Sequence, residues 1–180
     1  MATFVALLRA VNVSGQNKVP MAELRATMAA ADYGDVQTYL QSGNVVFEAP
    51  GDDATLQAAA VRDLIEQAFG LDVRVLVLTA TELARVVAAN PFLPAADVKH
   101  LHATFLDAPV SESAFGGLTL AAQPGEHAAL AASGRVVYLQ LPNGYGRTKL
   151  NNGYFERRLG AAATTRNWRT VLALAEMSKG

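Results

Sequence analysis

The hydrophobic and polar positions follow two periods along the chain, so strands and helices can be separated before any chemistry is considered. The segment from Phe4 to Val11 is an almost unbroken apolar run, interrupted by Arg9, which is typical of a strand buried on both faces. After a polar loop, Pro20 opens a segment with apolar residues at helical spacing, and Gly34 is placed to end that helix.

The remaining elements of the first half follow in the order strand, strand, helix, strand. Alternating or apolar runs predict strands at residues 36–41, 45–49 and 73–78. A helix capped by Asp53 and ended by Gly70 lies between the last two strands. The order β-α-β-β-α-β is that of a ferredoxin-like unit.

The second half repeats this order. A capping-box pattern, Thr79 with Glu82, predicts a helix at residues 80–89, which Asn90-Pro91 breaks, and the stretch to Lys99 is the best candidate for a linker. Strands are predicted at residues 101–107, 126–132, 136–141 and 161–165, and helices at residues 111–115, 150–159 and 167–177.

These elements predict an α+β fold, with two tandem ferredoxin-like (βαββαβ) halves, antiparallel sheets and a C-terminal helix. The expected domains are residues 1–90 and 91–180, forming one compact body. Hydrophobic residues make up 51% of the chain and charged residues only 17%, against roughly 25% in average domains. The low charge suggests that surface is covered, between the halves or by a partner, and alanine-rich composition explains it equally well.

Composition excludes several classes of chemistry. The chain has no cysteine, which excludes disulfides, thiolate catalysis and thiolate metal sites. Of the three histidines, His100 and His102 are expected on one strand face and His127 is isolated, so we expect no metal and no cofactor. The N-terminus lacks the pattern of a signal peptide, and no apolar run approaches the ~20 residues that span a bilayer, which predicts a cytoplasmic location without membrane contact.

The charge is unevenly distributed. The formal net charge of −1 argues against a general nucleic-acid binder. From Pro142 onwards, however, seven Lys and Arg residues stand against two Glu residues, a local net charge of +5. Such asymmetry marks either a basic face for an anionic partner or a solvated helix surface.

Four segments carry a family resemblance. They are residues 6–13 (ALLRAVNV), 17–25 (NKVPMAELR), 38–47 (TYLQSGNVVF) and 164–168 (TTRNW), the last followed by Thr170-Val171. With them the chain resembles the domain of unknown function 1697 (DUF1697) family over nearly its whole length. The resemblance implies a tandem ferredoxin-like fold and brings no activity. Ala10 departs from it, because the family usually has Gly there; we expect this to change packing rather than chemistry.

The direction of the predicted strands brings the loop after the first strand and the turn after the second to one end of the first sheet. The residues that we expect to bind a ligand there are Arg9, Asn12, Asn17, Lys18, Gln41, Ser42 and Asn44. The helix opened by Pro20 lacks a good N-cap, and an anion would satisfy its free amides with help from Lys18. Alternatively, Ser14 or Asn17 caps the helix and Arg9 pairs with an internal carboxylate.

A second polar stretch, residues 143–149, combines glycines, a hydroxyl and the cations Arg147 and Lys149, which is a pattern of phosphate nests and also of ordinary loops with solvated cations. Arg166 precedes Asn167-Trp168, where an indole and a guanidinium could stack on a base, although a lone Trp at helical spacing is more often core.

The sequence contains no recognisable catalytic constellation, so three classes of function stay open. The first is a binding protein for a small anionic or phosphate-bearing ligand held at the first loop, with nucleic acid an improbable partner. The second is an enzyme that acts on such a ligand with Arg9, Lys18 or Lys149 as electrophilic groups. The third is a pure interaction or dimerisation module.

Overall fold

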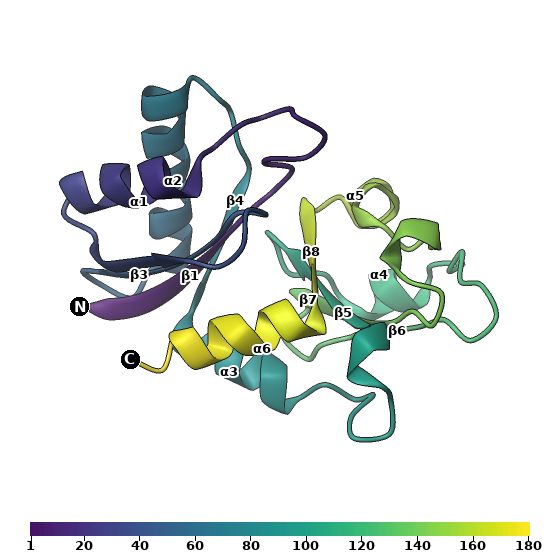
Figure 1. The fold of residues 1–180 in the computed structure, drawn as a ribbon. Coiled ribbons are helices and arrows are strands. Elements are labelled where there is room, and N and C mark those ends of the chain that lie inside the picture. The colour runs from purple at the N-terminus through teal and green to yellow at the C-terminus, as the bar shows by residue number, and fades with distance from the viewer. The chain divides into compact units, whose positions relative to one another are not determined.

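The computed structural model describes residues 1–180 and divides the chain into two compact units (Figure 1). Unit 1 comprises Met1–Ala84 together with Ala173–Gly180, and unit 2 comprises Arg85–Leu172. The division therefore falls six residues before the expected boundary at residue 90, and the last eight residues are grouped with unit 1. An α+β fold with two four-stranded antiparallel sheets and six helices is confirmed. That the two halves form one body stays a prediction.

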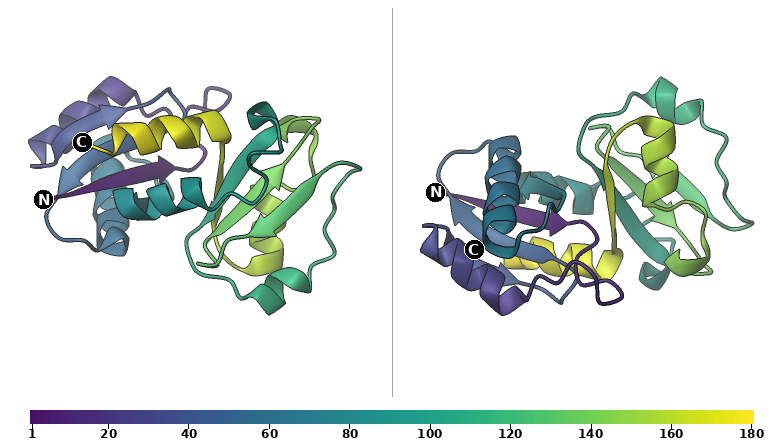
Figure 2. Two further views of the ribbon diagram at one scale, coloured as in Figure 1. Left: turned by 90° about the horizontal axis from the view of Figure 1, so that it is seen from below. Right: turned by 90° about the horizontal axis from the view of Figure 1, so that it is seen from above.

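Unit 1 contains one sheet and the two helices between its strands. Its elements are β1 (Ala2–Leu8), α1 (Met21–Ala30), β2 (Gly34–Thr38), β3 (Asn44–Ala49), α2 (Ala54–Phe69) and β4 (Val75–Thr79). The strand order is β2-β3-β1-β4, and every neighbouring pair is antiparallel. Helices α1 and α2 lie side by side on one face of this sheet (Figures 1 and 2).

The apolar run at the N-terminus forms the central strand, as its composition predicts. Residues Phe4 to Leu8 are at most 1% exposed, so β1 is buried on both faces. Phe4 stacks on Phe47 of β3 with ring centroids 5.6 Å apart, and the edge of Tyr33 meets Phe47 at 5.2 Å. The strand ends at Leu8 rather than at Val11, which places Arg9 just beyond the sheet.

Local capping signals set several helix boundaries where the sequence predicts them. The Asp53 carboxylate accepts hydrogen bonds from the amides of Thr55 and Leu56 at the start of α2. Thr79 and Glu82 cap α3 (Ala80–Ala88) reciprocally, since each side chain accepts from the other residue's backbone N–H.

Unit 2 repeats the strand order of unit 1. Its elements are η1 (Val98–His100), β5 (Leu101–Leu106), α4 (Glu112–Gly116), β6 (His127–Leu130), β7 (Val136–Gln140), η2 (Tyr145–Arg147), α5 (Asn152–Leu159) and β8 (Ala163–Asn167), and α6 (Trp168–Met177) begins in it and ends in unit 1. The order β6-β7-β5-β8 equals that of unit 1 when each strand is counted from the first of its own unit.

Two aromatic residues of unit 2 occupy core positions. Trp168 is fully buried and meets the ring of Tyr138 edge-on at 6.2 Å, which confirms the core interpretation of Trp168 and leaves no indole face for a base. The Tyr138 hydroxyl donates to the carbonyl of Val86 at 2.8 Å. One expectation is wrong: His100 lies in η1, so it does not share a strand face with His102.

Candidate functional site

The loop of residues 9–20 and the turn of residues 39–43 meet at one end of the unit 1 sheet, here called the first-loop end. The Asn12 side-chain amide donates to the carbonyl of Gln41 at 2.7 Å, and the Leu8 amide donates to the carbonyl of Gly43 at 2.8 Å. These bonds confirm the prediction that both segments lie at the same end of the sheet.

The side chains of two of the expected ligand-binding residues form hydrogen bonds within the loop and the turn. The Asn12 side chain also donates to the carbonyl of Val19 and accepts from the amide of Val19, both at 2.9 Å. Its amide group therefore connects the start of the loop with the end of the loop and with the turn. Asn44 is fully buried, and its amide donates to the carbonyl of Tyr39 and to the Ser42 hydroxyl, both at 2.9 Å. Both residues build the loop scaffold.

The other residues of the first-loop end are more open. Asn17 donates to the carbonyl of Ala10 at 3.1 Å, and Ser42 accepts from Asn44. Lys18 and Gln41 are exposed, and their side chains form no hydrogen bond or ion pair with the chain. Arg9 is half-buried, and its backbone amide donates to the carbonyl of Arg74 at 2.9 Å. The structure thus brings all seven expected residues of this set to one end of unit 1.

Backbone strain is concentrated at the same end. Five of the seven residues other than glycine with positive φ lie here, namely Ala10 (57°), Asn12 (55°), Ser14 (51°), Asn17 (49°) and Leu40 (59°), and the other two are Asp32 (64°) and Asp35 (37°). Each left-handed residue of this kind costs of order 1 kcal/mol, and such residues cluster at functional sites. Ala10 therefore sits where glycine adopts the same conformation without strain, which gives a physical reason for the glycine of the family pattern.

Gly43 allows the turn to approach β1. Its φ is +84°, and a Cβ atom built on it would lie 2.6 Å from the Cβ atom of Leu8 and 2.7 Å from the Cγ2 atom of Val11. No side chain can occupy that space without displacing buried neighbours. The glycine therefore fixes the distance between the turn and the end of β1.

The N-terminus of α1 opens at the first-loop end without a side-chain cap. Pro20 is its N-cap residue, and no side chain accepts from the first turn, so capping by Ser14 or Asn17 does not occur. The amides of Met21, Ala22 and Glu23 have no acceptor within the chain. Lys18 precedes this turn by three residues, and Glu23 places one carboxylate in it.

The second set of expected residues, Arg147, Lys149 and Arg166, lies in unit 2. Arg147 and Lys149 are exposed in η2 and just after it. Arg166 is half-buried in β8, where it donates to the Thr164 hydroxyl at 2.9 Å and to the carbonyl of Thr165 at 3.0 Å. Burial lowers the pKa of Arg166 to about 10, partly offset by Tyr145, so the guanidinium stays charged at neutral pH.

A network of polar side chains that the sequence does not predict lies near the start of α5. The Tyr145 hydroxyl accepts from the amide of Asn152 at 3.2 Å, and the Thr165 hydroxyl donates to the side-chain carbonyl of Asn152 at 2.7 Å and meets Thr104 at 2.8 Å. The His102 ring stacks on Tyr145 at 5.5 Å, and its Nδ1 is buried without a hydrogen-bond partner. Burial lowers the pKa of His102. Only the glycines beside Tyr145 hint at this network.

Neither a metal-ligand cluster nor a membrane-spanning helix is found in the structure. No group of three or more His, Cys, Asp or Glu side chains converges anywhere in the structure. No helix combines the length and the apolar content that crossing a membrane requires. The groups without a partner at the first-loop end include backbone amides of α1, the Lys18 ammonium group and the Gln41 side-chain amide.

The comparisons with known proteins agree with this class of molecule, an α+β protein of two antiparallel sheets. A family model described as "Protein of unknown function (DUF1697)" matches residues 1–138. The chain belongs to that family. A conserved bacterial protein, SP0830 from Streptococcus pneumoniae, has a similar solved structure, with a TM-score of 0.74, 20% sequence identity, and coverage of 99% of both chains. A search of curated proteins found no match.

Proposed function

We propose that this protein binds a small anionic ligand, such as one that carries a phosphate group, at the first-loop end of unit 1. The observation that carries the proposal is the N-terminus of α1, where three backbone amides lack acceptors beside the exposed Lys18. A helix N-terminus carries about half a positive charge, and its amides point at an incoming anion.

The scaffold around this helix end supports binding of a ligand by a rigid surface. Asn12 holds the loop against the Gln41 carbonyl, and Gly43 holds the turn against β1. A loop backbone held by these contacts presents Lys18 and Gln41 with less backbone entropy left to lose on binding. Glu23 acts against the proposal, since its carboxylate already lies in the first turn.

We propose further that each unit is a ferredoxin-like half and that the protein works in the cytoplasm. The element order β-α-β-β-α-β in both units and the shared strand order support the first statement. The absence of cysteine is in keeping with a reducing compartment and supports the second.

The interaction module is a second candidate function, because two large apolar side chains are exposed at the same end. Val13 and Leu40 are 57% and 56% exposed, and their neighbours Asn12 and Gln41 are hydrogen-bonded to each other. Exposed apolar side chains that gather in one place mark docking surfaces for partners. An enzyme that acts on the bound anion is the third reading, and turnover of a panel of phosphoesters separates it from a binder.

The test is a titration of the full-length protein with inorganic phosphate, pyrophosphate and nucleotides, followed by thermal shift and by NMR. A ligand that binds the native state raises the melting temperature with its occupancy. Lys18→Ala removes a charged donor worth roughly 1.5–3 kcal/mol and should weaken binding at least tenfold. Glu23→Gln removes a competing charge worth roughly 0.3–1 kcal/mol and should strengthen binding about two- to fivefold.

Lys179→Ala is the matched control, because Lys179 is also an exposed lysine of unit 1 and pairs with Glu176 at 2.6 Å. It should leave the affinity unchanged. Equal losses in Lys18→Ala and Lys179→Ala, or no binding of any of these anions, would rule out the first-loop end as their site.

A further inference from the structure

Four cationic side chains of unit 2 come from helix α5 or from the segment that leads into it, and none forms an ion pair with a carboxylate. They are Arg147, Lys149, Arg157 and Arg158, here called the α5 basic patch. All four are exposed, and none forms an ion pair within the chain. Two acidic residues lie near them: Glu156 is half-buried, and Glu126 is 5% exposed, with a carboxylate that accepts from the hydroxyl of Thr148, between Arg147 and Lys149, at 3.1 Å.

The two arginines of the last turn of α5 reach back towards its start. The Nη1 atom of Arg157 lies 3.1 Å from the position that a Cβ atom on Gly153 would take. The Cζ atom of Arg158 lies 5.9 Å from the ring centroid of Tyr154. Both guanidinium groups therefore lie over the first turn of the helix, because long side chains on a helix lean towards its N-terminus.

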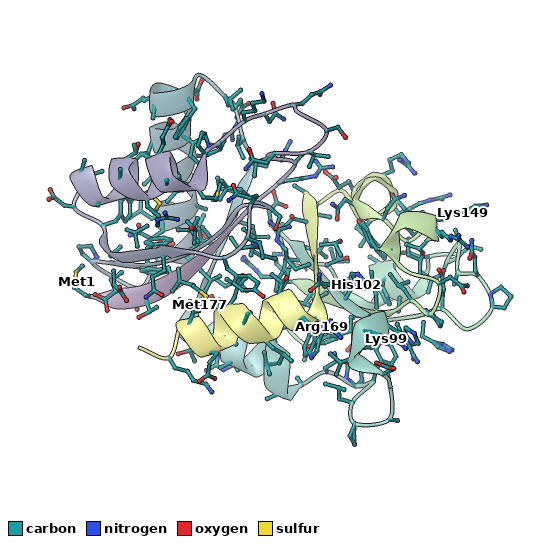
Figure 3. The ribbon with its side chains drawn as sticks, in the orientation of Figure 1. Met1, Lys99, His102, Lys149, Arg169 and Met177 are labelled. Carbon is teal, nitrogen blue, oxygen red and sulfur yellow. The ribbon has the colours of Figure 1, made fainter.

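The other two cations come from the segment that leads into the same turn. Arg147 and Lys149 precede the N-cap residue Asn151 by four and two residues. Figure 3 shows the Lys149 side chain on the outside of unit 2, beside α5. Four formal positive charges thus belong to the first turn of α5 and to the segment that leads into it, where the helix dipole is also positive. Such like charges repel one another, and water and salt only screen that repulsion.

We propose that the α5 basic patch binds a chain of phosphates, as found in inorganic polyphosphate or in the backbone of single-stranded nucleic acid. A single phosphate group carries at most about −2 charge. Four unpaired cations therefore call for at least two phosphates, which a linear polyanion supplies at regular spacing. The patch is independent of the first-loop end, since it lies in unit 2 and uses none of the residues of that site.

The neighbouring aromatic rings indicate recognition of charge rather than of bases. Tyr154 is only 6% exposed and is covered by Arg158, and Tyr145 stacks on His102. Tyr154 and one face of Tyr145 are therefore already in contact with other side chains, whereas sequence-tolerant nucleic-acid binders combine charge with aromatic rings on which bases stack. The net charge of −1 averages over the whole chain and hides this local excess.

The experiment measures binding of full-length protein to labelled polyphosphate and to labelled poly(U) RNA as a function of KCl concentration. Four contacts to a single-stranded polyanion give a slope of log affinity against log salt of about −2.8, a loss of about 50-fold between 50 and 200 mM salt. In the double variant Lys149→Gln/Arg157→Gln the slope should be half as steep, about −1.4, and the affinity should drop only about sevenfold between 50 and 200 mM salt.

The double variant Lys99→Gln/Arg135→Gln is the control, because it removes the same charge from exposed positions of unit 2 outside the patch. It should keep the original slope, as should Lys18→Ala, and thermal melts establish that all variants are folded. Binding of polyphosphate alone or of both polymers supports the patch and identifies the source of the phosphates. Binding of neither, or an equal loss of slope in the two double variants, overturns the proposal.

Discussion

Replacement of Gly43 by alanine is the most direct test of how the first-loop end is built. The added Cβ atom would meet the Cβ atom of Leu8 at 2.6 Å and the Cγ2 atom of Val11 at 2.7 Å. Both neighbours are at most 1% exposed, so neither can move into solvent. Overpacking of this kind costs about 1–3 kcal/mol, and the φ of +84° adds about 1 kcal/mol for a residue with a Cβ atom. The expected loss of stability is about 2–4 kcal/mol.

Gly15→Ala separates the two contributions. Gly15 has a similar φ of +75°, but a Cβ atom there would have no neighbour within 4 Å. Its replacement should therefore cost only the conformational term of about 1 kcal/mol, reduced by the lower entropy of the unfolded chain. The difference between the two variants isolates the steric term at Gly43.

The assay is urea unfolding followed by fluorescence and circular dichroism, with the midpoint compared at constant slope. The two units allow more than one transition, so the comparison applies to the transition that the variants shift. Equal destabilisation by Gly43→Ala and Gly15→Ala would show that Leu8 and Val11 yield to the added methyl group, and the close approach would then not be what positions the turn.

Three further substitutions test other features. Ala10→Gly should raise stability by about 0.5 kcal/mol, since relief of the left-handed strain at φ 57° exceeds the added entropy of the unfolded chain; a lower urea midpoint would contradict it. Asp53→Ala should cost about 1 kcal/mol by removing the cap of α2, and an unchanged midpoint would show that water replaces the carboxylate. Burial lowers the pKa of His102 below 6.5, so the unfolded chain takes up the proton first and stability should fall as the pH drops below 6.5. His102→Phe should flatten that part of the pH profile relative to the parent protein, and an identical profile in both would argue against a buried neutral imidazole.

Sequence reasoning succeeded where the signal is local. The caps at Asp53 and at Thr79 with Glu82 are bonds within three residues, so residue type and spacing were sufficient to place them. The buried strand β1 was equally predictable, because a short apolar run bounded by polar residues is typical of a strand buried on both faces.

Sequence reasoning did not anticipate contacts between segments that are distant in the chain. Asn12 was expected to face a ligand, and the polar type of the residue gave no hint that Val19 and Gln41 would occupy its amide. The left-handed conformation of Leu40 is imposed by its surroundings, since leucine itself disfavours it. The network of Tyr145, Asn152 and Thr165 likewise forms only when the sheet and α5 pack together, and the spacing of these residues in the sequence matches no known motif.

The return of the last eight residues to unit 1 has a consequence for biosynthesis. Unit 2 is a continuous stretch of chain, whereas unit 1 needs both Met1–Ala84 and Ala173–Gly180. A ribosome therefore releases every residue of unit 2 before it releases the last piece of unit 1, in which Leu174 and Ser178 are buried. Domains generally fold as units, the N-terminal one first during synthesis, but here the contacts of Ala173–Gly180 with unit 1 can form only after unit 2 has been synthesised. The burial of Leu174 and Ser178 is therefore among the last steps in the formation of the native structure during synthesis.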